Sequence, residues 1–580
     1  LGDVYKRQTV ICSDKTGTIT ANQMTVRSIW VSGKSYAVSG EGYRPEGEIT
    51  AQDDEGVIDP PADLIRLLSI GAMCNNAQIQ RDNGGWSAVG NPSEAALLVV
   101  AAKGGLDPHD LTDPSLRLGE VPFSSERKYM ATRHPRQEEE GTVAFVKGAP
   151  DRLLQMASHV LQDGRREPLD EELRSAFVEM QEKMASEALR VMAGAFRELP
   201  EAHGRLTSED VEQGLTLVGL WGMIDPPRAE SAPAVSAAQG AGIRPVMITG
   251  DHAVTALAIA RQVGISDRDR ALTAKDVERM DHDELARAAL ETGVFARVSP
   301  SHKLTIMDAL RRDGQIVAMT GDGVNDAPAL KGADIGIAMG RAGTEVAKEA
   351  ADMVLMDDDF STIVAAVEEG RTIYSNLRRV VFFLLATNLG EVLTLSSALL
   401  LGLDLPLTAV MILWINLVTD GVCTLPLGVE PGHPQVLKQP PRDPQEPIIA
   451  RKTLSRMALL TPLMTLGTLG LFVLTRQGTS LAYARTVAFT TLAAFQWFQT
   501  LNARSQDQSI FSIGLFSNRW VLVGLSAAVI LQLIAVQTPL GAWLFGTEPL
   551  RLLDWSWIVL ASSSIWIVDE IRKLWLRSRR

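Results

Sequence analysis

Long uncharged runs in the last third of the chain restrict its fold more than any other feature. A helix needs about 20 apolar residues to cross a membrane, and several such runs in succession are typical of a membrane domain. Two of the runs carry one acidic residue each, Glu391 and Asp420, and the others carry no charge. We therefore predict six spans, at residues 380–401, 407–427, 458–474, 486–503, 520–545 and 555–568.

Basic residues mark one side of these predicted spans. Arg378 and Arg379 precede the first run, and others lie between the second and third runs, between the fourth and fifth, and in the tail: Lys438, Arg442, Arg451, Lys452, Arg504, Arg519, Arg572, Lys573, Arg577, Arg579 and Arg580. Segments rich in Lys and Arg are typical of the cytoplasmic side. We therefore expect an integral multi-pass membrane protein whose polar first part and C-terminus are cytoplasmic.

Polar side chains also occur inside the first two runs, where each charge costs about 2.5–3.5 kcal/mol near the centre of a span. Asn388 and Glu391 are three residues apart, and Asn416, Thr419 and Asp420 recur at helical spacing, so each set is expected to share a face. An all-oxygen set favours a hard cation over a soft one. An interhelical hydrogen-bond cluster is the alternative, although two acids exceed what packing requires.

Three apolar strands in the polar part of the chain each end in a short polar loop. Asp14 ends the first strand and opens the run 14–20, Thr249 opens the loop after the second, and Gly321 opens the run 321–326 after the third. Helical stretches separate these strands. The pattern predicts a doubly wound parallel sheet, in which sites form at the carboxyl ends of the strands.

The residues in these loops suit phosphoryl transfer. The Asp14 carboxylate can attack a phosphoryl group while loop N–H groups hold the phosphate oxygens. Asp14 and Asp322 would hold Mg²⁺, which favours carboxylate and water ligands. Thr249 and Lys303 would bind the remaining phosphate oxygens. Any one of these loops could be an ordinary turn with a capping Asp, but the four pieces in this order favour a catalytic site.

Charge and cysteine content exclude other classes of function. The net charge is −13, and no basic cluster is large enough to predict nucleic-acid binding. Cys12, Cys74 and Cys423 show neither metal-ligand nor disulfide spacing. A P-loop is also absent, because Ser28 occupies the position where that motif needs its first glycine before Gly33–Lys34–Ser35.

The runs 14–20, 249–251 and 321–326 together resemble the P-type ATPases, cation pumps built on a haloacid-dehalogenase-like phosphorylation domain. Asp225–Pro226–Pro227–Arg228 is similar to the hinge of that family. The resemblance implies a catalytic set of Asp14, Lys15, Thr16, Thr249, Gly250, Asp251, Lys303, Asp322, Asn325 and Asp326, in which Asp14, Thr16 and Asp322 hold Mg²⁺.

Thr16 occupies a position where the wider superfamily often has an acidic catalyst. A hydroxyl is a poor general base, so water should attack the aspartyl phosphate slowly. A long-lived covalent intermediate suits a pump and argues against the alternative of a membrane-anchored phosphatase.

Residues 27–224 resemble the inserted α+β nucleotide-binding domain of the same family. The matching segments are 90–97, 122–130, 147–150 and 188–191. The resemblance places Glu94, Phe123, Lys128, Lys147, Arg190 and Arg297 around ATP. Taken alone, Phe123 would more often be a core residue, and Lys128 and Arg190 would be solvated.

The polar residues of the predicted spans resemble those of sarco/endoplasmic-reticulum-type calcium pumps, within the type II P-type ATPases. Gln496 stands where those pumps carry Glu, so it would add an oxygen ligand without a charge. The resemblance implies a transported cation, most simply Ca²⁺, held by Asn388, Glu391, Asn416, Thr419, Asp420 and Gln496. A pump for Mn²⁺, Mg²⁺ or Na⁺/K⁺ is the alternative.

The resemblance also implies the domain organisation. We expect a phosphorylation domain at 9–26 and 225–356, a nucleotide-binding domain at 27–224, a cytoplasmic stalk at 357–379 and a six-span membrane domain at 380–580. The family carries an actuator domain and four spans before this point. We therefore expect a truncated pump whose unmatched residues 1–8 are foreign to the native sequence, and a nucleotide-binding membrane fragment without turnover is the alternative function.

The expected partners follow from these assignments. They are ATP, metal cations (Mg²⁺ and the transported ion) and the lipid bilayer. No nucleic acid and no obligatory protein partner are expected.

Overall fold

The computed structural model describes residues 2–51, 60–82, 85–107, 114–136, 141–200, 205–433, 436–442, 446–447 and 449–578. Arg579 and Arg580 of the basic tail, and Leu1 of the segment 1–8, lie outside these residues. The chain forms two compact units, one of residues 9–364 and one of residues 1–8 with 365–580.

The first sheet of unit 9–364 is parallel throughout. Its seven strands run in the order β15 (Leu272–Thr273), β16 (Val294–Ala296), β14 (Arg244–Ile248), β1 (Val10–Asp14), β17 (Val317–Gly321), β18 (Ile335–Met339) and β19 (Met353–Leu355). The chain leaves β1 for β14 on one side and later reaches β17 on the other. The doubly wound prediction is therefore confirmed, and a topological switch point lies beside the end of β1.

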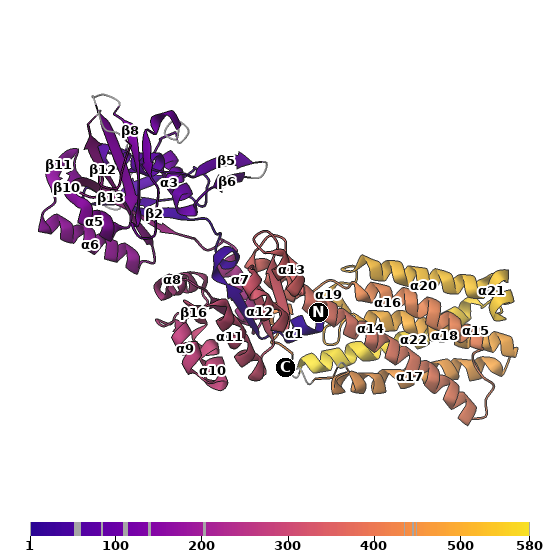
Figure 1. Cartoon of the computed structure of the whole chain (residues 1–580). Coiled ribbons are helices and arrows are strands. Elements are labelled where there is room, and N and C mark those ends of the chain that lie inside the picture. The colour runs from indigo at the N-terminus through magenta and orange to yellow at the C-terminus, as the bar shows by residue number, and fades with distance from the viewer. Residues whose placement is uncertain are drawn as a thin grey trace. The chain divides into compact units, whose positions relative to one another are not determined.

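Short helices connect these strands (Figure 1): α7 (Ser231–Gly240), α8 (Ala253–Val263), α9 (Ala274–Arg279), α10 (His282–Thr292), α11 (Pro300–Arg312), α12 (Ala327–Gly332) and α13 (Glu345–Ala350). Val10, Cys12, Val246 and Phe295 of the strands form one core with Ile306 and other apolar residues of the helices. Strands buried on both faces read as continuous apolar runs, which explains why the sequence revealed them.

The second sheet of unit 9–364 is mainly antiparallel. Its main path runs β4 (Ile49–Ala51), β3 (Lys34–Val38), β2 (Thr25–Val31), β13 (Leu215–Ile224), β12 (Arg190–Leu199), β9 (Thr142–Gly148), β8 (Tyr129–Pro135) and β7 (Gly119–Val121). β10 (Ala157–Gln162) pairs in parallel with β13 and antiparallel with β11 (Arg165–Pro168). A separate hairpin contains β5 (Gln78–Asp82) and β6 (Gly85–Val89).

Helices cover both faces of this second sheet. α2 (Ala62–Met73) and α3 (Pro92–Lys103) share one core with Ile29 and Trp221. α5 (Pro150–Met156) and α6 (Glu171–Ser186) contribute to the other core, where Phe177 meets Trp30 edge to face at 4.7 Å between ring centroids.

The second unit is helical. It contains α1 (Gly2–Arg7), α15 (Ala409–Trp414), η4 (Ile415–Thr419), α16 (Asp420–Gly428), α17 (Arg451–Arg476), α18 (Leu481–Ala503), α19 (Ile510–Ile513), α20 (Arg519–Gln537), α21 (Pro539–Phe545), α22 (Leu552–Ser578) and most of α14 (Phe360–Leu400). Within the described part of the chain, five helices are long and apolar enough to cross a membrane: residues 360–400, 409–428, 451–476, 519–537 and 552–578.

Two predicted spans differ from these helices. The run 486–503 falls on α18, which is helical but is not among the five, because Gln and Asn side chains lower its hydropathy. Most of α18 is buried among its neighbours, so its crossing stays a prediction. The predicted span 520–545 is wrong at its end: α20 stops at Gln537, since Pro539 disfavours helical backbone at Thr538 and begins α21.

Candidate functional site

Asp14 is the last residue of β1, at the switch point of the parallel sheet. Its backbone N–H donates to Thr320 Oγ1 at 2.8 Å, which fixes the strand end against β17. Its Oδ1 accepts the Lys15 N–H at 2.9 Å. Gly17 in the following loop has φ 80°, a left-handed conformation that costs glycine little. The loop therefore turns sharply and leaves the Asp14 carboxylate at the sheet edge.

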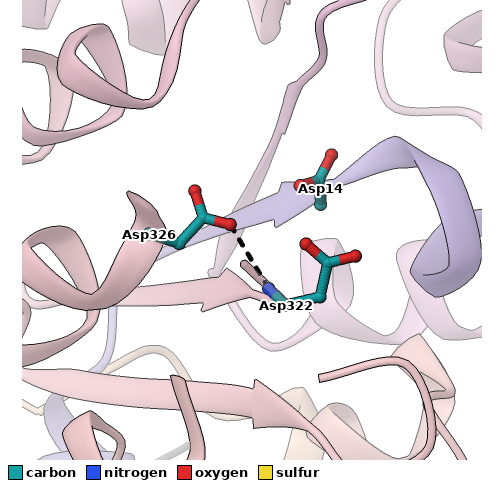
Figure 2. A group of neighbouring side chains, drawn as sticks. All are labelled: Asp14, Asp322 and Asp326. Carbon is teal, nitrogen blue, oxygen red and sulfur yellow. Dashed lines mark hydrogen bonds between the residues drawn. The ribbon is translucent and has the colours of Figure 1, made fainter. Parts of the chain in front are cut away.

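Three carboxylates meet at this edge. Asp14, Asp322 and Asp326 each offer an oxygen, and these oxygens all lie within 4.8 Å of one another (Figure 2). The N–H groups of Asp322 and Gly323 donate to Asp326 Oδ2 at 3.3 and 3.2 Å. Such an all-carboxylate set has the chemistry that Mg²⁺ prefers, so the residues present fit the expected ion.

Lys303 supplies the counter-charge of this cluster. Its Nζ lies 2.6 Å from Asp14 Oδ2 and 3.0 Å from Asp326 Oδ1. Burial lowers the pKa of the Lys303 ammonium, but the carboxylates of Asp14 and Asp326 outweigh burial and leave that pKa raised. Burial, followed by the charges of Asp14 and Asp326, raises the pKa of Asp322. Three carboxylates around one ammonium leave two acids in excess, so the cluster attracts a further cation.

Lys15 points to a second group of acids. Its Nζ lies 2.6 Å from Asp251 Oδ2 and 3.8 Å from Asp225 Oδ2. Asp225 also accepts hydrogen bonds from Thr20 Oγ1 and from the Gln23 N–H, at 2.5 and 3.1 Å. Lys15 and Asp225 therefore join the loop after β1 to the segment after β13.

The loop after β14 lies beside this group. Thr249 is buried and accepts the Asp251 N–H through Oγ1 at 3.1 Å, across Gly250. The Arg297 N–H donates to the Asp251 carbonyl at 2.9 Å. Thr16 and Asn325 of the predicted catalytic set are exposed, whereas Lys15, Thr249, Lys303 and Asp326 are buried. Arg297, which was predicted to bind ATP, is also exposed.

The expected nucleotide residues meet only in part. Lys147 Nζ lies 2.7 Å from Glu94 Oε1, which joins β9 to α3. The register of β12 with β9, Gly194 opposite Lys147, puts Arg190 on the same face of the sheet as Lys147, four residues from Gly194 along the strand. Glu94, Lys147 and Arg190 thus line one face.

Phe123 and Lys128 lie in the loop between β7 and β8. Phe123 is 61% exposed, which is an unusual state for a large aromatic side chain. Lys128 has φ 60°, its N–H donates to Ser124 O at 2.8 Å, and its Nζ lies 3.7 Å from Asp151. The ring is therefore free to stack on a ligand.

The polar residues of the helical unit gather around Glu391 and Asp420, which are both buried. Gln496 Nε2 donates to Glu391 Oε1 at 3.2 Å, and Asn416 is within hydrogen-bonding reach of the same carboxylate. Thr387 is within reach of Asp420. Among the described residues, Asp420 Oδ1 and Gln496 Oε1 are buried without a hydrogen-bond partner. Unpaired oxygens of this kind are what a bound cation would complete.

Asn388 does not join this group. Its side chain is exposed and its amide donates to the Leu384 carbonyl of its own helix at 2.7 Å. Thr419 is buried beside Asp420 at the end of η4, a wide turn in which the Asp420 N–H donates to the carbonyl of Ile415. Such single wide turns inside helices are frequent at functional sites.

Three family models match the chain. "P-type ATPase, cytoplasmic domain N" matches residues 63–230, "haloacid dehalogenase-like hydrolase" matches 304–367, and "Cation transporting ATPase, C-terminus" matches 404–575. The chain is 42% identical over 564 residues to the cation-transporting ATPase pma1 of Synechocystis, covering 94% of this chain and 62% of that protein.

The chain belongs to the P-type cation-transporting ATPases. It is also 40% identical over 559 residues to a calcium-transporting ATPase of Bacillus subtilis, covering 96% of this chain and 62% of that protein. The calcium-transporting ATPase type 2C member 1 of Homo sapiens is 38% identical over 583 residues, 98% of this chain and 61% of its own length. The chain thus spans about three fifths of the P-type ATPases it matches.

Some residues of this P-type ATPase site were not predicted from the sequence. Thr320 holds the Asp14 backbone, Asp225 receives Lys15, and Thr387 reaches Asp420. Thr320 directly precedes Gly321, and Thr387 directly precedes Asn388. Their positions beside predicted site residues were therefore the signal in the sequence that could have identified them. A small hydroxyl residue at the end of an apolar run is too common to indicate such a contact alone.

Proposed function

We propose that this chain is the catalytic and ion-binding part of an ATP-driven cation pump that works through a phosphorylated Asp14. The observation that carries the proposal is the cluster of Asp14, Asp322, Asp326 and Lys303 at the switch point of the parallel sheet. In this mechanism an Asp14 carboxylate oxygen attacks the γ-phosphorus of ATP. The bond to the bridging oxygen breaks, and ADP leaves with that electron pair.

Each neighbour has a separate role in this proposal. Lys303 offsets the negative charge that gathers around Asp14 in the transition state. Asp14, Thr16 and Asp322 would hold Mg²⁺, which supplies charge neutralisation of the phosphate oxygens when it is bound. Thr249 would donate to a phosphate oxygen. Thr16 offers no carboxylate base, so the aspartyl phosphate would persist until another domain hydrolyses it.

The nucleotide would bind on the second sheet. Phe123 would stack on adenine, since its ring is exposed. Lys147, Lys128 and Arg190 would approach the phosphates, and Glu94 would orient Lys147 through their 2.7 Å ion pair.

The transported ion in this proposal is Ca²⁺, held in the helical unit by Glu391, Asp420, Thr419, Asn416 and Gln496. Two carboxylates balance one Ca²⁺, and the neutral oxygens approach the 6–8 ligands this ion prefers. Asn388 faces away from the group, so water would complete the shell. The names of two compared relatives, calcium-transporting ATPases at 40% and 38% identity, support this choice. The basic residues between the spans support a cytoplasmic position for the catalytic domains.

Labelling with [γ-³²P]ATP tests the chemistry. The wild-type chain should form an acid-stable, hydroxylamine-sensitive phosphoenzyme, and Asp14→Asn should form none while retaining nucleotide binding. Asp313→Asn is a suitable control, because Asp313 is exposed at the end of α11. Labelling of the Asp14→Asn variant at the wild-type level would refute the assignment.

The ion assignment is tested in the full-length protein. Glu391→Gln and Asp420→Asn should each weaken the Ca²⁺ dependence of phosphorylation. Activation of the wild type by Na⁺ or Mn²⁺ instead of Ca²⁺ would refute the calcium assignment without touching the phosphoryl chemistry.

A further inference from the structure

A pocket of about 300 Å³ lies beside the second sheet of unit 9–364, at the N-terminal end of α2. Val31, Pro61 and Ala62 form its apolar wall, and polar residues from β3, α2 and two hairpin turns also line it. Pockets for small organic molecules typically enclose about 300–1,000 Å³ and combine an apolar lining with a few placed polar groups. None of the residues assigned above to ATP or to a metal lines this pocket.

Two hairpin turns of the same kind flank the pocket. The β2–β3 hairpin turns at Ser32 and Gly33, and the β10–β11 hairpin turns at Asp163 and Gly164. Their φ angles are 50°, 74°, 46° and 78°, which are typical of tight two-residue turns. Asp63 of α2 joins the turns: its Oδ2 accepts Ser32 Oγ at 2.6 Å, and both its oxygens accept the Gly164 N–H at 3.0 Å. The walls are therefore fixed before any ligand binds.

The acidic side of the pocket lacks a cation. Asp63 is 4% exposed, and no basic side chain pairs with it or with Asp163 among the residues that the structure describes. Tyr36 is 2% exposed, and within the same residues its hydroxyl makes no hydrogen bond. Burial, followed by the charges of Asp163 and Asp63, raises the pKa of Tyr36, so its hydroxyl lies near both carboxylates. Because buried charges are usually paired, an ammonium group would complete this side.

The opposite charge is provided by Lys34 and by the start of α2. Lys34 lines the pocket, yet among the described residues it forms no ion pair with Asp63 or with Asp163. Pro61 precedes α2 and provides no side-chain cap, so the N–H groups of the first turn are left without one. The N-terminal end of a helix is positively polarised and favours an anionic group. The pocket thus presents both charges without joining them.

We propose that this pocket binds a small zwitterion, a free α-amino acid with an apolar side chain. Its ammonium group would lie among Asp63, Asp163 and the Tyr36 hydroxyl. Its carboxylate would face Lys34 and the first turn of α2, and its side chain would contact the apolar wall. A metal ion fits less well, because both Asp63 oxygens already accept hydrogen bonds and the pocket is much larger than one ion.

The pocket is separate from the residues proposed to bind ATP. α2 has 12 residues and is about 18 Å long. Its far end leads to Asn75, whose Nδ2 donates to the Glu94 carbonyl at 2.8 Å. The amino-acid site therefore does not depend on the proposed phosphoryl chemistry, and a bound amino acid should not compete with ATP.

Saturation-transfer difference NMR on the detergent-solubilised 580-residue chain tests the binding. At least one of L-alanine, L-valine and L-leucine should bind. Each is compared with the analogue that lacks its ammonium group and the one that lacks its carboxylate, which for L-valine are isovalerate and isobutylamine. Both analogues should bind at least about tenfold more weakly, since each loses one charged contact. The proposal fails if none of the three amino acids binds, or if either analogue binds as tightly as its parent.

Variants test the location of the site. Asp163→Asn and Lys34→Met should each weaken binding by about tenfold. Asparagine tolerates positive φ, so the turn at position 163 should persist. Glu167→Gln and Lys183→Met are matched controls that should not change the affinity, because both residues are exposed and neither lines the pocket. Unchanged affinity in either pocket variant, or displacement of the amino acid by ATP, would overturn the proposal.

Discussion

Two acidic groups described above, one at the end of β1 and one in the helical unit, differ in how their negative charges are balanced. At the end of β1, Lys303 lies between Asp14 and Asp326, and amide N–H groups hold Asp326. In the helical unit, Glu391 and Asp420 meet only neutral side chains among the contacts described, and Asp420 Oδ1 has no hydrogen-bond partner within the described residues.

The acidic cluster at β1 has a protein counter-charge, Lys303, whereas the group around Glu391 and Asp420 would obtain its counter-charge from a bound ion. The cluster of Asp14, Asp322 and Asp326 can hold its shape before any metal binds, because the Lys303 ammonium already pairs with two of its carboxylates. No such cation is among the described contacts of Glu391 and Asp420, so a bound ion would supply much of the stability of this group. The contrast predicts that removing a carboxylate charge changes stability in opposite directions in the two regions.

Removing the built-in counter-charge should have the largest effect. Lys303→Met should destabilise unit 9–364 by about 3 kcal/mol, because it leaves the half-buried Asp14 and the buried Asp326 without their ammonium partner. Pulse proteolysis of the whole chain in urea, followed through fragments of that unit, would measure this. Mg²⁺ should restore much of the loss.

A surface pair provides the control for Lys303. Lys348 lies 3.0 Å from Glu345, whose side chain is 84% exposed. Lys348→Met should therefore change stability by less than about 0.5 kcal/mol. Equal losses for the two lysine variants would show that the cluster does not depend on its internal cation.

Removing a carboxylate charge should have opposite signs in the two regions. With a chelator present, Asp420→Asn should stabilise the helical unit by about 1 kcal/mol, because it removes a buried charge whose Oδ1 is unpaired. Asp326→Asn should destabilise unit 9–364, since Asp326 binds Lys303 and two amides. Thermal unfolding of the detergent-solubilised chain would compare them.

Adding Ca²⁺ provides a second test of the comparison between the wild type and Asp420→Asn. At a hundredfold excess over Kd it should stabilise the wild type by about 2.7 kcal/mol. The Asp420→Asn variant should gain much less, so that the order of the two proteins reverses. A gain from Asp326→Asn in the chelator, or a loss from Asp420→Asn, would contradict the contrast between the regions.

The smallest effect is expected at Asp322, the acid of the Asp14 cluster for which no ion pair with Lys303 is described. Its pKa is raised by burial and by Asp14 and Asp326, so its charge opposes folding once the pH exceeds that pKa. This cost is absent below the ordinary pKa of an aspartate, grows as the pH rises from that pKa to the raised folded-state pKa, and is complete above it. Asp322→Asn should therefore stabilise the metal-free chain at neutral pH by less than about 1 kcal/mol, a limit set by solvent screening.

Urea titrations at acidic and neutral pH would measure the Asp322 effect. The gain should vanish at low pH, where the wild-type carboxyl is protonated, and it should reverse with Mg²⁺, which favours the charged carboxylate. A gain that did not change with pH would assign the effect to packing instead of charge.

The sequence predicted the parallel sheet because its strands are buried on both faces and end in distinctive loops. The meeting of Asp14 and Asp322 followed from parallel topology alone, since Asp14 ends β1 and Asp322 directly follows the neighbouring strand β17. The pairing of Lys15 with Asp251 did not follow, because a lysine beside a candidate nucleophile is equally consistent with phosphate binding. Only the loop geometry decides which way its side chain points.

In the helical unit, the spacing of polar residues predicted which of them share a helix face, but it did not predict what each face contacts. Glu391 and Asp420 are buried as expected, whereas Asn388, three residues before Glu391, turns its amide to its own helix. A three-residue step rotates a side chain by about 300°, so residues at this spacing are offset by about 60°. The end of α20 at Gln537 also escaped prediction, because an uncharged sequence continues through Pro539.

The wide turn η4 has a consequence for motion. It places one more residue in its turn than an ordinary helix would, immediately before Asp420. An extra residue of this kind can migrate along a helix by exchanging one hydrogen-bond partner at a time, without unwinding the remainder. A shift of one position would rotate the passed side chain by about 100° around the helix axis. A shift of the wide turn by one residue would therefore change the direction in which the Asp420 side chain points.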